Sequence, residues 1–379
     1  MKKKLIMMLS SFLAAGTILA ACGQADDDAD ETPAGNGGDE TGEETGDDTA
    51  QGGDSDFTVS MVTDTGGVDD KSFNQSAWEG LGEFGGDFDI DVNYIQSSDP
   101  SDYAPNLNRL AREGVSLSYA IGFLMEDDVR TVAEQNPDAQ FAIVDTVVAD
   151  EDGNTYPNIA NITFAEHQGS FLVGVVAGLQ TETDQIGFVG GVNSPLIKKF
   201  ENGFKAGVKA VNPTAEVVVQ YAETFNDASV GQSIADTMYA NGADIIYHAA
   251  GGTGNGVFTT AKNLANSGET VWVIGVDKDQ HEEGEWSGGN VTLTSMVKRV
   301  DKAVYQVAER TMNGDYPGGE ILEFGLDDEG VGIAPTVDNV TEESLNAVEE
   351  WKQRILDGEI TVPQTDDEYD EFLQSLPNE

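Results

Sequence analysis

Short apolar runs alternate with longer segments of helical period along most of the chain. Nine of these runs are predicted strands: residues 57–62, 90–95, 117–121, 141–144, 186–189, 217–221, 245–248, 271–276 and 291–295. Most are rich in β-branched residues and show no polar alternation, which is typical of strands buried on both faces. Joined by helices, such strands predict an α/β fold with parallel sheets. The pattern runs once before about residue 165 and again after it, so we expect two similar lobes.

One predicted helix is marked at both ends. Ser194 is a suitable N-cap and Pro195 suits the first helical position, whereas Asn212 and the proline after it end the segment. The apolar residues between them fall on one face: Ile197, Phe200, Phe204, Val208 and Val211. Residues 226–242 and 257–268 show a similar pattern and also predict helices.

The C-terminal part of the chain carries a weaker pattern. Residues 342–356 predict a helix with Leu345, Val348 and Ile355 facing inward. Residues 366–379 are acidic, and we expect them to be peripheral.

The N-terminus has the pattern of an export signal. Three lysines precede an uncharged apolar stretch that ends at Ala21, so residues 1–21 predict a signal peptide. Cys22, the only cysteine, follows small residues as in a bacterial lipobox, where the thiol receives a lipid. The alternative is an ordinary signal peptide with a chance cysteine. A lipid on Cys22 would anchor the protein on the outer side of the cell membrane.

Residues 22–56 predict a disordered linker behind that anchor. They carry 13 Asp and Glu, no Lys or Arg, and too few apolar residues to bury a core. The whole 379-residue chain has a formal net charge of −50, which we interpret as adaptation to salt or high pH. A nucleic-acid partner is excluded because this charge repels phosphates. One cysteine also excludes a disulfide framework.

Ligands of parallel α/β sheets bind beyond the carboxyl ends of the strands, and several polar and aromatic residues follow predicted strands. They are Asp64, Phe73, Asn74, Asp145, Phe225, Gly251, Gly252, Asp277 and Lys298. An aromatic ring offers a flat face for a base or a sugar, and a carboxylate suits a vicinal diol. The glycine spacing after the strand at 245–248 fits neither a Walker loop nor a dinucleotide fingerprint.

Five segments resemble the basic membrane protein (BMP) family of nucleoside-binding lipoproteins. They lie in order at residues 62–80, 186–207, 249–256, 274–280 and 294–298, and the likeness covers about residues 57–320. The resemblance implies a two-lobed type I periplasmic-binding-protein fold, each lobe a parallel sheet flanked by helices, joined by a hinge. It implies capture of nucleosides, purines first, for an ABC transporter permease. The strongly acidic charge departs from the family's name.

The resemblance also implies a role for each candidate residue. Phe73 and Phe225 would stack on the two faces of the base. Asp145 would accept hydrogen bonds from the base edge. Asp64 and Asn74 would lie near the base. On the sugar side, Asp277 would accept from ribose hydroxyls and Lys298 would reach a sugar oxygen. Gly251 and Gly252 would let the backbone approach the ligand.

We expect residues 57–164 and 280–310 to form the first lobe, and residues 165–279 and 311–379 the second. We also expect a monomer that uses no cofactor or metal and is not an enzyme. Three alternatives stay open: an exported nucleoside-processing enzyme, the same fold binding a sugar or signalling ligand, and a surface adhesion or sensor protein.

Overall fold

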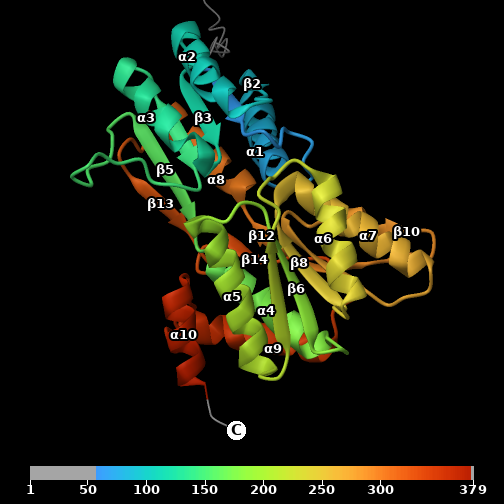
Figure 1. The fold of residues 1–379 in the computed structure, drawn as a ribbon. Coiled ribbons are helices and arrows are strands. Elements are labelled where there is room, and N and C mark those ends of the chain that lie inside the picture. Colours follow the sequence, from blue (N-terminus) through green and yellow to red (C-terminus); the bar gives the residue numbers. More distant parts are fainter. Residues whose placement is uncertain (1–56, 377–379) are drawn as a thin grey trace, which may run out of the picture. The chain divides into compact units, whose positions relative to one another are not determined.

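Two six-stranded sheets form the framework of the protein (Figure 1). The computed structural model describes residues 57–376, so the predicted signal peptide, Cys22 and the predicted acidic linker lie outside the described residues. The first sheet has the order β13-β5-β4-β3-β1-β2 and is parallel throughout. Its strands are β1 (Val59–Thr63), β2 (Val92–Ile95), β3 (Leu117–Ile121), β4 (Phe141–Val144), β5 (Ile159–Phe164) and β13 (Ile321–Phe324).

The second sheet repeats this arrangement, with the order β14-β12-β9-β8-β6-β7. Its edge strand β14 is antiparallel to β12, and the other strands are parallel. The strands are β6 (Gln185–Gly190), β7 (Glu216–Tyr221), β8 (Ile245–Ala249), β9 (Trp272–Asp277), β12 (Thr292–Lys298) and β14 (Val331–Ile333). A two-stranded hairpin of β10 (Glu285–Trp286) and β11 (Gly289–Asn290) precedes β12. The predicted α/β fold with two parallel-dominated sheets is confirmed.

Helices cover both faces of each sheet. In the first lobe, α1 (Phe73–Phe88) and α8 (Val300–Met312) pack on one face, and α2 (Tyr103–Glu113) and α3 (Glu126–Gln135) on the other. In the second lobe, α4 (Glu166–Gln180) and α5 (Pro195–Val211) pack opposite α6 (Ala228–Ala240) and α7 (Asn255–Asn266). Short 3-10 turns lie at Pro100–Asp102, Phe123–Met125, Gly251–Gly254 and Glu282–Gly284. No helix within residues 57–376 is both long enough and apolar enough to span a membrane.

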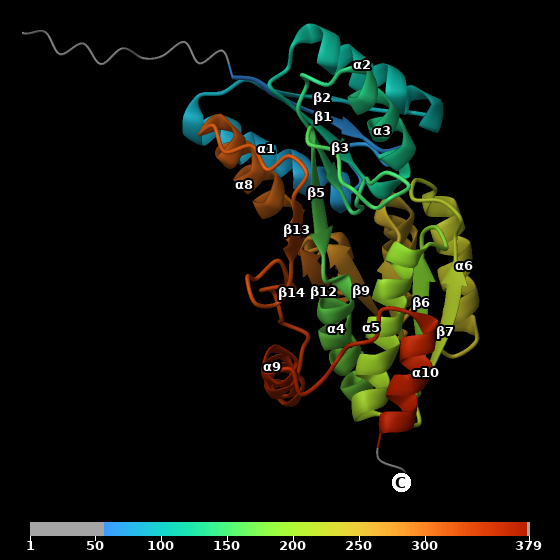
Figure 2. The same ribbon diagram turned by 90° about the vertical axis from the view of Figure 1, so that its left-hand side faces the viewer.

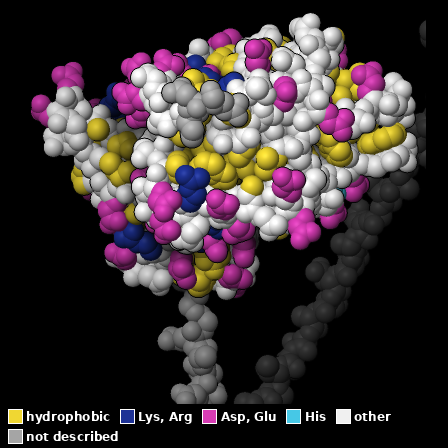
Figure 3. Space-filling model, turned by 90° about the horizontal axis from the view of Figure 1, so that it is seen from below, with side chains coloured by type: hydrophobic (Ala, Val, Ile, Leu, Met, Phe, Trp, Pro, Cys, Tyr) yellow, Lys and Arg dark blue, Asp and Glu magenta, His cyan; other side chains and the backbone are white. Residues whose placement is uncertain are grey.

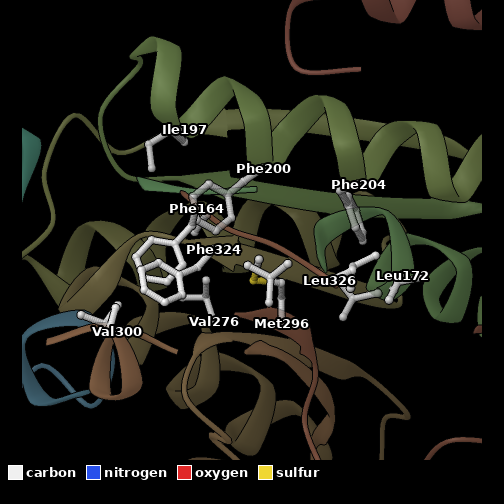
Figure 4. Close-up of a cluster of buried hydrophobic side chains, with 14 of the residues drawn as sticks. Phe164, Leu172, Ile197, Phe200, Phe204, Val276, Met296, Val300, Phe324 and Leu326 are labelled. Carbon is white, nitrogen blue, oxygen red and sulfur yellow. The ribbon is translucent and has the colours of Figure 1, made fainter. Parts of the chain in front are cut away.

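The marked helix forms as its sequence predicts. The Ser194 hydroxyl accepts the Ile197 N–H at 3.3 Å, and α5 ends at Val211, directly before Asn212. Phe200 and Phe204 from its apolar face enter a cluster that also receives side chains from β5, β9, β12 and β13 (Figure 4). Burial of that face stabilises α5 where it borders the space between the sheets.

The chain crosses between the lobes three times. It crosses after Phe164, again after Lys298, and finally between β13 and β14. The lobe boundaries expected within 280–310 and 311–379 are therefore wrong at two strands. β12 pairs with β9 of the second sheet, and β13 pairs with β5 of the first. An apolar run shows that a strand forms, but it does not show which sheet offers the free edge.

The C-terminal segment is an integral part of the second lobe. Helix α9 (Glu342–Leu356) has the predicted bounds, and Val348 and Ile355 are buried. The expectation that the last segment is peripheral is wrong for α10 (Asp366–Ser375), which lies against α5 (Figure 2). Tyr369 and Phe372 of α10 are buried. These two side chains and the ion pair of Asp366 with Lys198, at 3.2 Å, dock an otherwise acidic helix.

Candidate ligand-binding site

A cavity lies between the two lobes, at the carboxyl ends of their strands. The empty space among its lining residues, open solvent included, is about 520 Å³. Its lining is Asp64, Gly66, Asp70, Phe73, Asn74, Gly122, Phe123, Asp145, Leu196, Ile197, Phe200, Phe225, Ala249, Ala250, Gly251, Val276, Asp277 and Lys298.

The structure brings eight of the nine predicted ligand-binding residues into this one lining; the exception is Gly252. A Cβ added at Gly252 would lie 3.3 Å from the carbonyl oxygen of Phe225 and 3.8 Å from the Cβ of Asp70. Gly252 therefore lies at the junction of the lobes, beside the cavity. The predicted lipid-bearing Cys22 is outside the described residues.

An amide and two carboxylates form a network on the first-lobe side. The Asn74 amide nitrogen donates to Asp64 at 2.8 Å and to Asp70 at 3.0 Å. Asp70 also accepts the backbone N–H groups of Ser72, Asn74 and Gln75 at the start of α1. Asp70 was not among the predicted site residues, although it lies in the same short segment. It fixes Asn74, and Asn74 orients Asp64.

The one lysine in the lining joins the two lobes. Lys298 ends β12 in the second lobe, and its Nζ donates to Oδ2 of Asp145 in the first lobe at 2.6 Å. The Nζ also lies 4.9 Å from the ring centre of Phe73. Both charged groups are buried, and Oδ1 of Asp145 has no hydrogen-bond partner among residues 57–376. Buried acceptors in folded proteins nearly always have a hydrogen-bond partner, so this oxygen is an exception among the described residues.

Asp277, at the end of β9, is the second-lobe carboxylate that corresponds to Asp145 of the first lobe. It accepts a hydrogen bond from the Ser72 hydroxyl, a first-lobe group. Burial raises the pKa of Asp277 to about 7, against the opposing effect of Lys298. Burial also raises the pKa of Asp64 and of Asp145 to about 6 each. These carboxyl groups therefore change charge close to neutral pH.

Aromatic rings supply the apolar part of the lining. The predicted Phe73 and Phe225 both border the cavity, and the ring centre of Phe123 lies 6.3 Å from that of Phe225, edge to face. Phe123 and Phe200 were missed by the sequence analysis. Phe123 is the second residue after the end of β3, so the strand-end rule alone was enough to find it. Phe200 was assigned only to the core face of its helix.

Side-chain amides of the second lobe hold the first-lobe segment 64–73. Asn226 donates to the carbonyl oxygen of Thr65 at 3.1 Å, and Asn255 to that of Asp70 at 3.1 Å. Gln280 donates to the carbonyl oxygen of Lys71 at 2.9 Å. These bonds join neutral groups across the cleft, and the structure is a closed arrangement of the lobes.

Comparison with known proteins decides the family. The model of a family described as "Bmp: ABC transporter substrate-binding protein PnrA-like" matches residues 57–366. The chain belongs to the Bmp family. A curated relative, the "CD4+ T-cell-stimulating antigen" of Listeria innocua, is 49% identical over 375 residues, covering 96% of this chain and 99% of the relative. The predicted family resemblance is confirmed.

Two further similar proteins have names that state a role. The "ABC transporter nucleoside-binding protein BmpA" of Lactococcus lactis is 38% identical, covering 96% of this chain and 99% of the relative. A solved structure, an ABC transporter solute-binding protein from Aeropyrum pernix, is 26% identical with a TM-score of 0.74, covering 84% of this chain and 96% of that one. This Bmp-family chain is thus an extracytoplasmic substrate-binding protein of an ABC transporter, in a family of binding proteins rather than enzymes.

Proposed function

We propose that this protein captures nucleosides, purine nucleosides first, in the cavity between its lobes and delivers them to an ABC permease. The observation that carries the proposal is the pairing of aromatic rings with buried carboxylates around one cavity. Phe73, Phe123 and Phe225 offer apolar surface to a planar base. Asp145 and Asp277 offer acceptors to N–H and hydroxyl donors.

The positions of the two carboxylates suggest a different role for each in binding a nucleoside. Oδ1 of Asp145, without a partner among the described residues, would accept from the base edge. Asp277, held by Ser72, would accept from the ribose hydroxyls. A ligand that lacks either donor leaves a buried carboxylate unpaired, and this costs about 1–3 kcal/mol or more. The printed name of the Lactococcus lactis relative supports the same ligand class.

The charge of the lining argues against phosphorylated ligands. Four carboxyl groups, from Asp64, Asp70, Asp145 and Asp277, face a single cation, Lys298. A phosphate would be repelled by these groups and would find no arginine in the lining to pair with. Neutral nucleosides, rich in donors, suit this electrostatic environment best.

The anchoring part of the proposal concerns residues outside the described structure. A lipid on Cys22 would hold the protein at the outer face of the cell membrane, with the acidic segment 22–56 as a tether. Mass spectrometry of protein from its native membrane tests this, because lipidation adds a defined mass that Cys22→Ser abolishes. We further propose that one copy of the chain is sufficient for binding.

The ligand class is tested by thermal unfolding at high salt with nucleosides, free bases, nucleotides and sugars. A ligand at 100 times its Kd adds about 2.7 kcal/mol, a shift of several degrees for a chain of this size. We expect nucleosides to raise the Tm and nucleotides to have no effect. A shift with sugars but not with nucleosides would show that the proposed ligand is wrong. If no compound shifts the Tm, mass spectrometry of the denatured protein shows whether a nucleoside was already bound.

A further inference from the structure

Lys298 has a second carboxylate neighbour that does not line the cavity. Glu166 is the first residue of α4 and is fully buried. Its Oε1 lies 3.6 Å from Nζ of Lys298, and its Oε2 lies 3.2 Å from Nζ of Lys199 on α5. Lys199 also donates to the carbonyl oxygen of Phe164 at 3.2 Å. Charges of alternating sign thus run from Asp145 through Lys298 and Glu166 to Lys199.

The two carboxylates beside Lys298 belong to different lobes. Asp145 follows β4 of the first lobe, whereas Glu166 begins α4 of the second lobe, the lobe that carries Lys298. Asp145 and Lys298 are too deeply buried to meet a ligand unless the lobes separate. Separation takes Asp145 away from Lys298, but it leaves Glu166 in place because both residues move with the second sheet.

A buried ammonium group without a counter-ion is costly, because burial disfavours its charged form. In the closed arrangement three rings lie 4.9–5.5 Å from Nζ of Lys298: Phe73 and Phe164 of the first lobe and Phe200 of the second. Phe200 stays beside the ammonium group when the lobes separate. Two of the carboxylates beside Lys298, Glu166 and Asp277, belong to the second lobe and stay with it in both arrangements of the lobes. Of these two, Glu166 is the one that forms an ion pair with Lys298 among the described residues.

We propose that Glu166 is a positioning residue of the binding site: held by Lys199, it keeps Lys298 charged and aimed at the cavity while the cleft is open. When the cleft closes, Lys298 meets Asp145 and the ligand as a ready donor. This inference rests on the proposed function for its ligand, but the ion pair itself can be measured without one.

The groups that act on Lys298 come from several elements. Asp145 follows β4, Asp277 ends β9, and Glu166 begins α4. Burial lowers the pKa of Lys298, but these three carboxylates outweigh burial and raise it above its ordinary value. Removal of the Glu166 charge lowers that pKa, so the ammonium deprotonates, and binding weakens, at a lower pH than in the wild type.

The test compares the wild type with Glu166→Gln, Lys298→Met and the double variant, with inosine and adenosine as probes in calorimetry from pH 6 to 10.5. We expect Glu166→Gln to weaken binding about tenfold at pH 7.5, the effect of losing one pairwise interaction of ordinary size. We also expect an alkaline loss of affinity within this pH range in Glu166→Gln but not in the wild type, because the pKa of the wild-type Lys298 lies above its ordinary value. Glu342→Gln is the matched control, because Glu342 also begins a helix but is exposed and meets no lysine in the described ion pairs.

Three outcomes decide the proposal. Wild-type affinity and pH profile in Glu166→Gln would overturn it, and so would a loss of affinity with an unmoved alkaline limb, which marks a merely structural role. If the wild type binds neither probe, the proposed ligand fails, and the ligand-free Tm of the four proteins decides on Glu166 alone. We then expect Glu166→Gln to lower the Tm less in the Lys298→Met background than in the wild type, and equal losses would overturn the proposal.

Discussion

Asp145 and Asp277 occupy equivalent positions in the two lobes. Asp145 directly follows β4, the fourth strand of the first lobe along the chain, and Asp277 ends β9, the fourth strand of the second. Both have left-handed backbone conformations, with φ of 76° and 66°. Residues other than glycine rarely adopt such a conformation unless the surroundings impose it. The repeated fold therefore presents two acidic side chains to one cavity, one from each lobe, and chain-specific contacts then differentiate them. Asp145 meets Lys298, and Asp277 meets Ser72.

We predict that Asp277→Asn stabilises the ligand-free protein at pH 8 while it abolishes nucleoside binding. The folded state holds the Asp277 proton up to a pKa of about 7, above the unfolded value near 3.8, so the aspartate's contribution to stability is full below pH 3.8 and lost as the pH rises to 7. Asparagine does not ionise, so the variant does not lose stability in this way as the pH rises. The gain at pH 8 is at most about 4 kcal/mol.

Thermal unfolding at pH 5 and pH 8 measures the Asp277→Asn effect. The variant should gain more over the wild type at pH 8 than at pH 5. The same linkage predicts that nucleoside affinity of the wild type rises between pH 5.5 and 8, because the ionised carboxylate is the stronger acceptor. A flat affinity profile in the wild type would contradict this.

Removal of single rings should weaken nucleoside binding with little effect on folding. Phe73→Ala, Phe123→Ala and Phe225→Ala should each cost about 1–3 kcal/mol of base contact, or about 5- to 150-fold in Kd. Leu124→Ala is the control, since Leu124 follows Phe123 in the chain but is exposed. Calorimetry with inosine measures the effect. Equal affinities of Phe123→Ala and Leu124→Ala would remove Phe123 from the site.

The amide contacts between the lobes should act on all ligands alike. Asn226→Ala combined with Asn255→Ala removes two hydrogen bonds that join the closed lobes, and neither asparagine lines the cavity. We expect the affinities for inosine, adenosine and guanosine to fall by the same factor, about tenfold for two bonds of ordinary strength. The exposed Asn263→Ala on α7 is the control. A change in the ratio between the three affinities would show that these residues contact ligand.

High salt should stabilise the protein strongly. Acidic side chains are spread over the face drawn in Figure 3, and basic ones are few. The chain has 69 Asp and Glu against 19 Lys and Arg, so its surface charges repel one another. Raising the salt from about 0.1 to 1 M shortens the screening length from about 10 to 3 Å, and the Tm should rise by several degrees. Sodium chloride and sodium sulfate should act equally at matched low ionic strength, and a sulfate-specific rise would contradict screening.

The sequence predicted the strands that carry the site better than it predicted which sheet each later strand joins. All nine predicted strands form. β5 was missed, since Asn161 and Thr163 interrupt its apolar pattern. β13 and β14 are short edge strands with partly exposed residues. Short edges make few contacts, so their sequences carry little apolar signal.

The site was predictable where a residue follows a strand and unpredictable where it acts through another residue. Asp145 and Asp277 are at strand ends, and both line the cavity. Glu166 follows the missed strand β5, and its link to Lys298 joins positions 132 residues apart in the chain. No local sequence pattern indicates such a pairing. It arises only in the folded protein, where the segment that crosses between the lobes after Phe164 lies beside the segment that crosses after Lys298.

The three crossings also set the order in which the protein can be completed during synthesis. The sixth strand of the first sheet, β13, is made only after β6, β7, β8, β9 and β12 of the second. The second sheet in turn receives its last strand, β14, seven residues after β13 ends. Neither lobe is a continuous stretch of polypeptide, so neither can finish folding before about residue 330 has been synthesised. A nascent chain that stops earlier exposes two open sheet edges, and the two lobes must mature together.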